Sequence, residues 1–188
     1  VTYFRPATLK TTDLKVFDQL SESLRKLITH ALDTASKNKW MKYLYGGASP
    51  SDGGFDCSGA MYYVFRKAGL QPPRTSAQQF IWLRDLKKIT TISGRPQSLD
   101  DLIFKKLTAG DMLFWSSTYI PTDGRSVKIT YVSLYLGQEK DGRHVMIGAT
   151  KGRSYRGKKR DGYGVYDFRL PSETSKARFV GFGSPCAR

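Results

Sequence analysis

The sequence predicts an α+β domain in which helices pack on an antiparallel β-sheet. Apolar residues recur at helical spacing in the first half of the chain, and short β-rich runs separated by Asp-Gly turns follow Gly110. Helices first and strands afterwards are typical of this class rather than of alternating β-α-β units.

The amino-acid composition excludes several classes of protein. A chain of 188 residues with 39% hydrophobic residues can bury one domain core, which excludes a disordered tail. Lys or Arg interrupts every apolar run, which excludes a membrane-spanning helix. The net charge of +15 indicates an anionic partner or surface: nucleic acid, acidic glycan or anionic lipid. The start at Val1 fits either a processed secreted protein or a trimmed chain.

The helical half begins with a long amphipathic pattern from Thr12 to about Lys39, capped near Asp13. A Gly-, Ser- and Pro-rich loop over 46–54 leads into a second helix that opens at Cys57 and ends near Gly69. Further helices are predicted from Ser76 to about Lys88 and from Ser98 to Lys106. The predicted strands are Met112–Trp115, Ile129–Leu136, Val145–Ala149, Tyr163–Phe168 and Phe179–Gly181.

Cys57 is the first candidate for chemistry. A cysteine in the first turn of a helix faces free backbone N–H groups and the positive end of the helix dipole, which favour the thiolate. Asp56 supplies a polar cap, and Ser58-Gly59 leaves room for a substrate backbone. The alternative is a buried cysteine that only packs. The other cysteine, Cys186, is a less favoured disulfide partner, and two cysteines with two histidines make no four-ligand zinc site.

Five motifs in order resemble those of the NlpC family of papain-like cell-wall cysteine peptidases, over about Tyr43 to Phe168. They are Tyr45-Gly46-Gly47, Phe55-Asp56-Cys57-Ser58-Gly59, Pro73-Arg74-Thr75-Ser76-Ala77-Gln78-Gln79, Ala109-Gly110-Asp111-Met112-Leu113-Phe114 and Tyr131-Val132-Ser133-Leu134-Tyr135-Leu136-Gly137. The resemblance implies a papain-like domain over residues 43–188 after an N-terminal helical extension over 1–42. It also implies a periplasmic, secreted or envelope-associated bacterial enzyme that needs no metal or organic cofactor. Such an enzyme cleaves peptidoglycan stem peptides, commonly between D-glutamate and diaminopimelate.

The resemblance also assigns residues. It makes Cys57 the nucleophile and places Tyr45 beside it as a hydroxyl donor. Asp56, Ser58, Arg74 and Ser76 would contact the charged ends of the substrate. Local alternatives stay open, because Asp56 can be only a helix cap, Arg74 only an ion-pair partner and Tyr45 only a packing residue.

The sequence departs from the family at the catalytic base. Tyr131 stands where the family has its histidine, and Gly148 stands where a third polar residue is expected. A phenol with a reference pKa near 10 is a poor proton acceptor at neutral pH. His144 is the alternative base, although it lies four residues from the expected position, about 13 Å along a strand, and can equally be a surface histidine. His30 is expected to be structural.

Two functions remain open at this stage. The first is a hydrolase in which Cys57 works with Tyr131 or a displaced base, with activity lowered by about 10²–10⁴-fold. The second is a catalytically degenerate relative that binds cell-wall peptide or a protein partner. The basic segment from Gly152 to Lys158 can grip an anionic wall polymer or be a plain turn. Nucleic-acid binding ranks last because no known module accompanies the charge.

Overall fold

The fold combines helices with an antiparallel sheet, which confirms the predicted α+β class. The structure is a computed structural model that describes residues 1–38 and 40–187. Its α-helices are α1 (Glu22–Lys37), α2 (Cys57–Lys67) and α3 (Ser76–Asp85). Its strands are β1 (Lys42–Tyr43), β2 (Ala48–Ser49), β3 (Gly54–Phe55), β4 (Ile89–Thr91), β5 (Met112–Ser116), β6 (Ile129–Gln138), β7 (His144–Tyr155), β8 (Lys158–Asp167) and β9 (Arg178–Gly183).

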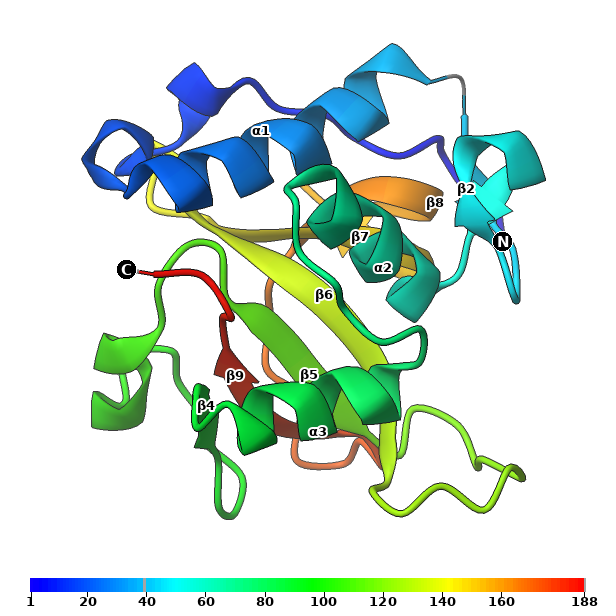
Figure 1. The fold of residues 1–188 in the computed structure, drawn as a ribbon, viewed down its shortest axis with the longest axis vertical. Coiled ribbons are helices and arrows are strands. Elements are labelled where there is room, and N and C mark those ends of the chain that lie inside the picture. The colour runs from blue at the N-terminus through cyan, green and yellow to red at the C-terminus, as the bar shows by residue number, and fades with distance from the viewer. Residues whose placement is uncertain (39, 188) are drawn as a thin grey trace.

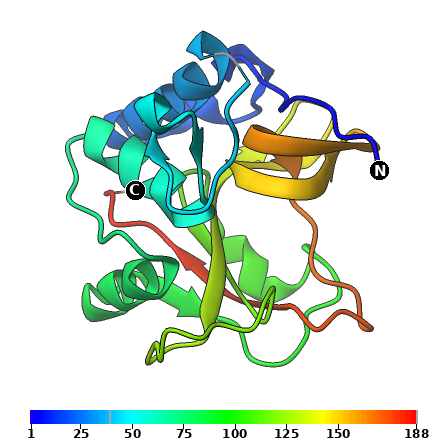
Figure 2. The same cartoon turned by 90° about the vertical axis from the view of Figure 1, so that its right-hand side faces the viewer.

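The main sheet runs through the middle of the molecule, and the helices cover one face of it. Within the described residues its order is β4-β9-β5-β6-β7-β8, with every neighbouring pair antiparallel. In Figure 1, α1 lies at the upper end and α3 at the lower end, with α2 between them in front of β6. Figure 2 shows the long β7–β8 hairpin curling away from the helices. A small sheet of order β1-β3-β2 lies at the start of α2.

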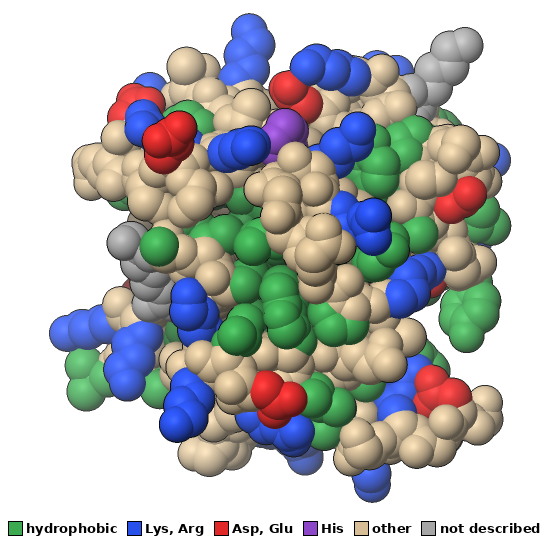
Figure 3. All heavy atoms as spheres, in the orientation of Figure 1, with side chains coloured by type: hydrophobic (Ala, Val, Ile, Leu, Met, Phe, Trp, Pro, Cys, Tyr) green, Lys and Arg blue, Asp and Glu red, His purple; other side chains and the backbone are tan. Residues whose placement is uncertain are grey.

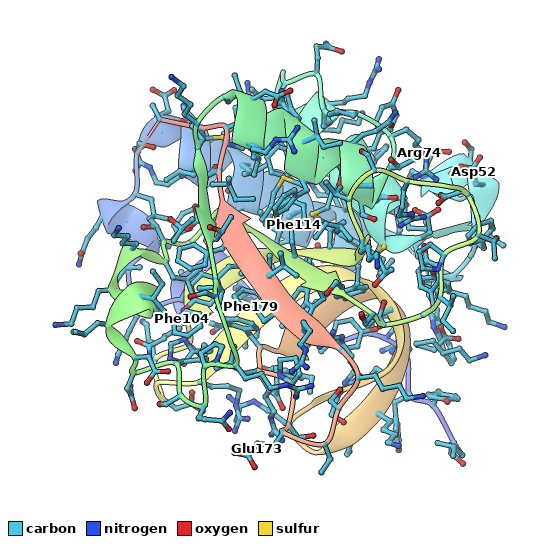
Figure 4. The ribbon with its side chains drawn as sticks, turned by 90° about the horizontal axis from the view of Figure 1, so that it is seen from below. Asp52, Arg74, Phe104, Phe114, Glu173 and Phe179 are labelled. Atoms are coloured by element: carbon cyan, nitrogen blue, oxygen red, sulfur yellow. The ribbon has the colours of Figure 1, made fainter. Side chains whose placement is uncertain are left out.

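Aromatic residues fill both faces of the sheet. On the α3 side, Phe114 of β5 meets Phe80 of α3 with ring centroids 5.4 Å apart. On the other side, Phe104 packs on Phe179 at 6.0 Å, and Trp115 is fully buried beside Phe179 at 5.1 Å. Figure 4 shows Phe104, Phe114 and Phe179 gathered around the central strands. These contacts fix the strands that carry one half of the candidate site.

The N-terminal helix is shorter than predicted. Short 3₁₀ turns at Thr11–Asp13 and Phe17–Gln19 replace its first part, and the predicted end at Lys39 lies outside the described residues. Leu14 forms an isolated bridge with Glu139, and the Lys15 N–H donates to the Gln138 carbonyl. The apolar spacing there reflects packing on the end of the β6–β7 hairpin, because this contact overrides the local helical pattern.

Two other predicted helices are also shorter. The helix predicted from Ser76 ends at Asp85, and only a 3₁₀ segment, Leu102–Lys106, forms in the range predicted from Ser98. The strands are longer than predicted, since β7 and β8 continue through the basic segment and join at a tight turn at Arg156 and Gly157. That segment is therefore a β-hairpin tip.

Lys and Arg side chains are spread over the surface around a central apolar area, as Figure 3 shows for one face. This distribution follows from 31 Lys and Arg against 16 Asp and Glu. No helix among the described residues has the length and apolar character required to cross a bilayer.

Candidate active site

The loop before α2 holds Cys57 at the end of the small sheet. Asp56 is the N-cap of α2, and its carboxylate accepts a hydrogen bond of 2.6 Å from the Gly59 N–H. Glycine is required at 59, because a Cβ there would lie 2.0 Å from the Gly47 carbonyl oxygen. The local chain thus places the Cys57 thiol at the helix N-terminus, as predicted from the sequence.

The Cys57 thiol is buried rather than open to water. Its residue is 8% exposed, and burial raises the pKa of the thiol to about 11. The backbone N–H groups of Val132 and Ser58 act in the opposite direction, since they favour the thiolate. The helix end therefore supplies the expected donors, but burial dominates and keeps the sulfur protonated at neutral pH.

Asp56, Ser58 and Arg74 form one polar cluster beside the thiol. The Arg74 guanidinium donates to both carboxylate oxygens of Asp56, at 3.1 and 2.9 Å, and to the Ser58 hydroxyl at 3.0 Å. Asp56 also accepts from the Gly46 N–H at 2.9 Å. Figure 4 shows Arg74 close to the loop that carries Asp52. Asp56 is thus both a cap and the counter-ion of Arg74, and the Arg74 side chain stays 33% exposed toward a ligand.

Ser76 does not join this cluster. It is buried at the start of α3, and its hydroxyl donates to the Ile129 carbonyl of β6 at 3.5 Å. The neighbouring Gln79 is fully buried and donates to the carbonyls of Ser58 and Pro73 at 3.0 and 2.9 Å. Ser76 and Gln79 therefore join α3 to the site, and the expected substrate contact of Ser76 is not supported by its position.

The tyrosine beside the thiol is Tyr43, which corrects the sequence prediction of Tyr45. Tyr45 is 87% exposed at the turn after β1. Tyr43 is half-buried, and its pKa is raised by burial and by the nearby Cys57 and Asp56. Strand alternation turns Tyr43 toward the site, since it pairs with Phe55 in the parallel β1–β3 ladder. The segment Tyr43-Leu44-Tyr45 contains both tyrosines. The sequence does not reveal the β1–β3 pairing that turns Tyr43, and not Tyr45, toward the site.

Tyr131 lies on β6, on the strand side of the site and near Cys57. It is 7% exposed, and burial raises the pKa of its hydroxyl, while the Arg153 charge opposes the rise and Cys57 adds to it. Its hydroxyl makes no hydrogen bond of good geometry with any residue in 1–38 or 40–187, although the Thr150 and Ser133 hydroxyls approach it. Tyr131 is therefore a protonated phenol that cannot accept the thiol proton.

Arg153 covers the ring of Tyr131, which sequence reasoning did not predict. Its guanidinium carbon lies 4.6 Å from the Tyr131 ring centroid and 4.8 Å from the ring of Trp115. The two rings are themselves 5.2 Å apart. The register shift of β7 between Lys151 and Ser154 brings Arg153 to this position. The stack fixes Tyr131 in place.

His144 is not part of the site, which overturns its role as an alternative base. It pairs with Gln138, six positions beyond Val132 on β6, or about 20 Å along the strand. Its two ring nitrogens interact with the Tyr135 hydroxyl at 2.7 Å and the Gln138 amide at 3.0 Å. His30 lies on α1. His144 is thus placed away from Cys57.

Gly148 offers no side chain, and the space beside it is filled. A Cβ at Gly148 would lie 2.8 Å from the Ser133 hydroxyl oxygen. Ser133 is fully buried and donates to the Ile147 carbonyl at 2.8 Å. The Ser133 hydroxyl of the neighbouring strand therefore fills the space beside Gly148.

The site has no companion thiol or metal cluster in the described part of the chain. Cys57 and Cys186 are both free thiols. No group of three or more His, Cys, Asp or Glu residues within 1–38 and 40–187 is arranged to hold a metal ion.

Comparison with known proteins agrees with this geometry. The NlpC/P60 family profile matches residues 40–162. The bifunctional muramidase/DL-endopeptidase CwlT of Bacillus subtilis is 34% identical over 103 residues, which cover 55% of this chain and 25% of the relative. The gamma-DL-glutamyl hydrolase of the same organism is 33% identical over 104 residues, covering 55% of this chain and 20% of the relative. The matches thus span a quarter or less of these curated relatives.

Solved structures share the fold. A lipoprotein-like NLP/P60 family protein from Staphylococcus aureus superposes with a TM-score of 0.53 at 24% identity, over 100% of this chain and 46% of the other. RipD of Mycobacterium tuberculosis, a non-catalytic NlpC/p60 domain protein adapted to peptidoglycan binding, gives 0.51 at 18% identity, over 89% and 100%. Because the family profile matches more than half of the residues, the chain belongs to the NlpC/P60 family.

Proposed function

We propose that this chain is a bacterial envelope domain that binds the stem peptides of peptidoglycan without hydrolysing them at an appreciable rate. The observation that carries the proposal is the buried Tyr131 beside the buried Cys57, since a cysteine nucleophile needs a neighbouring base and a phenol is a poor one. Both the thiol and the phenol stay protonated at neutral pH, so no group accepts the proton that nucleophilic attack must release.

The ligand class is supported by the helix side of the site. Arg74 is paired with Asp56 but keeps 33% of its side chain exposed, where it can attract a ligand carboxylate. Ser58 offers a hydroxyl next to Arg74, and Tyr43 offers one near Cys57 and Asp56. The curated relatives are named as a DL-endopeptidase and a gamma-DL-glutamyl hydrolase, enzymes of D-amino-acid-containing peptides. The RipD protein offers a precedent for a family member without catalysis. A peptide with D-glutamyl and diaminopimelyl residues is the ligand that combines these features.

A slow cysteine endopeptidase is the second candidate. The backbone N–H groups of Val132 and Ser58 lower the pKa of the Cys57 thiol and can serve as oxyanion donors. A small thiolate fraction would then attack a peptide carbonyl, with water as the proton acceptor. This candidate predicts slow cleavage between D-glutamate and diaminopimelate.

The decisive experiment measures binding and cleavage with the same peptides. A purified stem peptide is titrated calorimetrically, and the mixture is then analysed by mass spectrometry for new amino and carboxyl termini. Binding without new termini is expected. Cleavage that disappears in Cys57→Ala would establish the second candidate, and the absence of both binding and cleavage would refute the peptide assignment.

A matched pair of variants locates the ligand. Tyr43→Phe removes a hydroxyl beside the thiol, whereas Tyr45→Phe removes one from an exposed turn. We expect several-fold weaker binding for Tyr43→Phe and unchanged binding for Tyr45→Phe. The reverse order would place the ligand at the turn instead.

A further inference from the structure

A large hollow opens at the end of the sheet next to the candidate active site. Its volume is about 1130 Å³, and its walls come from the segment 117–130 and the loop 173–178, with Arg95 at one side. Figures 1 and 2 both show these two segments at the lower end of the molecule, opposite α1. The volume exceeds the roughly 300–1,000 Å³ of most small-molecule pockets, so it suits an extended ligand.

Each wall is held in place by a different arginine. Arg125 donates to both carboxylate oxygens of Asp123, at 2.8 and 2.7 Å, to the Tyr119 hydroxyl at 3.0 Å, and to the Ile129 carbonyl. Arg95 donates to the carbonyls of Ser172, Glu173 and Ser175 at 2.8, 2.9 and 2.5 Å. These contacts connect segments up to 80 positions apart, so the hollow is a built feature of the fold.

Three further cations line the hollow with their charges uncompensated. Lys128, Lys176 and Arg178 are exposed, and none of them forms an ion pair with a residue in the described part of the chain. The acidic residue of the lining is Glu173, whose side chain points outward in Figure 4. Cations grouped in a concave site attract anions over a distance of several ångströms.

The hollow lies beside the candidate active site. Thr130 lines it and immediately precedes Tyr131 on β6. The Ile129 carbonyl accepts hydrogen bonds from Arg125, which lines the hollow, and from Ser76 at the start of α3. The start of β6 therefore separates the hollow from the site, and an extended ligand can reach both.

We propose that the hollow binds the carboxylate-rich part of the stem peptide whose other part lies at Cys57. The inference rests on the proposed function and names the part of the ligand that the domain recognises. The D-glutamyl and diaminopimelyl residues of stem peptides carry free carboxylates outside the peptide linkage, and Lys128, Lys176 and Arg178 supply matching cations. The hollow thus makes the domain selective for peptides with free rather than amidated carboxylates.

The test compares two forms of one peptide on two sets of variants. The ligands are a stem pentapeptide with free carboxylates and the same peptide with these groups amidated. The test variant is Lys128→Gln/Lys176→Gln/Arg178→Gln. The matched control is Lys10→Gln/Arg25→Gln/Lys26→Gln, which removes the same charges from exposed positions before or within α1, away from the hollow. Melting temperatures confirm that both variants fold.

The wild-type protein is expected to bind the free peptide about tenfold more tightly than the amidated one at low ionic strength. The test variant should lose this preference, and the control should keep it. Equal affinity of the wild type for both forms, or equal effects of the two variants, would overturn the inference and leave the proposed function standing. Failure of both peptides to bind would overturn the proposed function and the inference with it.

A phosphate polymer provides the last arm of the test. Poly(glycerol phosphate) presents anions of a different class, and its binding is measured on the same variants. If the test variant loses affinity for this polymer while its affinity for both peptide forms equals that of the wild type, the hollow is a phosphate-polymer site and the peptide inference is wrong.

Discussion

The two sides of the candidate site differ in how their polar groups are held. On the helix side, Asp56, Ser58 and Arg74 form one hydrogen-bonded cluster next to Cys57. On the strand side, the Tyr131 ring lies beneath Arg153, and its hydroxyl has no hydrogen-bond partner among residues 1–38 and 40–187. The helix side thus presents an ordered polar cluster to a ligand, whereas the strand side presents a buried phenol.

Folding explains why the two sides differ. Asp56 caps α2, holds the loop at Gly46 and pairs with Arg74, so the fold itself depends on it. Tyr131 needs only to fill space against Trp115 and beneath Arg153, which an aromatic ring does at little energetic cost. The fold therefore depends on the side chain at 56, whereas position 131 requires only an aromatic ring of suitable size.

The largest effect is expected when the missing base is restored. Tyr131→His places an imidazole with a reference pKa near 6.5 opposite the thiol, where it can accept the proton. Cleavage of stem peptides should rise by about 10²–10⁴-fold over the wild type. Mass spectrometry of the products measures the rate.

Two controls accompany this variant. Adding Cys57→Ala should abolish the gained activity, and adding His144→Ala should leave it unchanged because His144 lies at the far end of the hairpin. If Tyr131→His cleaves stem peptides no faster than the wild type, the strand side lacks other groups that catalysis requires besides a base.

On the helix side, Asp56→Ala should cost about 3 kcal/mol of the free energy of unfolding. The change leaves the half-buried Arg74 guanidinium without its counter-ion and removes the cap of α2. Urea denaturation measures the loss. Asp52→Ala is the matched control, since that exposed carboxylate accepts from the Ala48 and Ser49 N–H groups of its own loop, and its effect should be smaller. Equal losses would contradict the central role of Asp56.

The buried thiol makes stability depend on pH in the alkaline range. The folded pKa of Cys57 is about 11, against a reference value of 9.0, so below pH 9 the thiol contributes fully to stability. Between pH 9 and 11 the unfolded state ionises first, and about 2 kcal/mol of stability is lost.

Urea denaturation of the wild type and Cys57→Ala across this range isolates the contribution, because all other titrations are common to both. The stability difference between the two proteins should change by about 2 kcal/mol from pH 8 to pH 11. A difference that stays constant with pH would show that the thiol is accessible to water in solution.

The smallest effect concerns the stack above Tyr131. Arg153→Met should lower the free energy of unfolding by about 1 kcal/mol, because the guanidinium loses its contacts with two rings. The loss should persist in a Tyr131→Phe background, since the contact is with the ring. Lys151→Met is the control, because the Lys151 ammonium lies over a single ring, 5.5 Å from the Tyr3 ring centroid. If both changes cost the same, the stack has no special role.

The sequence carried the local features of the fold and site, and missed the features set by distant contacts. Neighbouring residues encode the cap at Asp56, the position of Cys57 at the start of its helix, and the residue types that mark each strand. The choice between Tyr43 and Tyr45 depends on the β1–β3 pairing, and the length of the first helix depends on Leu14 at the β6–β7 hairpin. Arg153 reaches Tyr131 only through an irregular register in β7.

The close contact between Gly148 and Ser133 bears on any attempt to redesign the site. A side chain at 148 would have to displace the Ser133 hydroxyl from its hydrogen bond to the Ile147 carbonyl. A base can therefore be introduced at 131 by a single substitution, whereas a polar group at 148 calls for a paired change at 133.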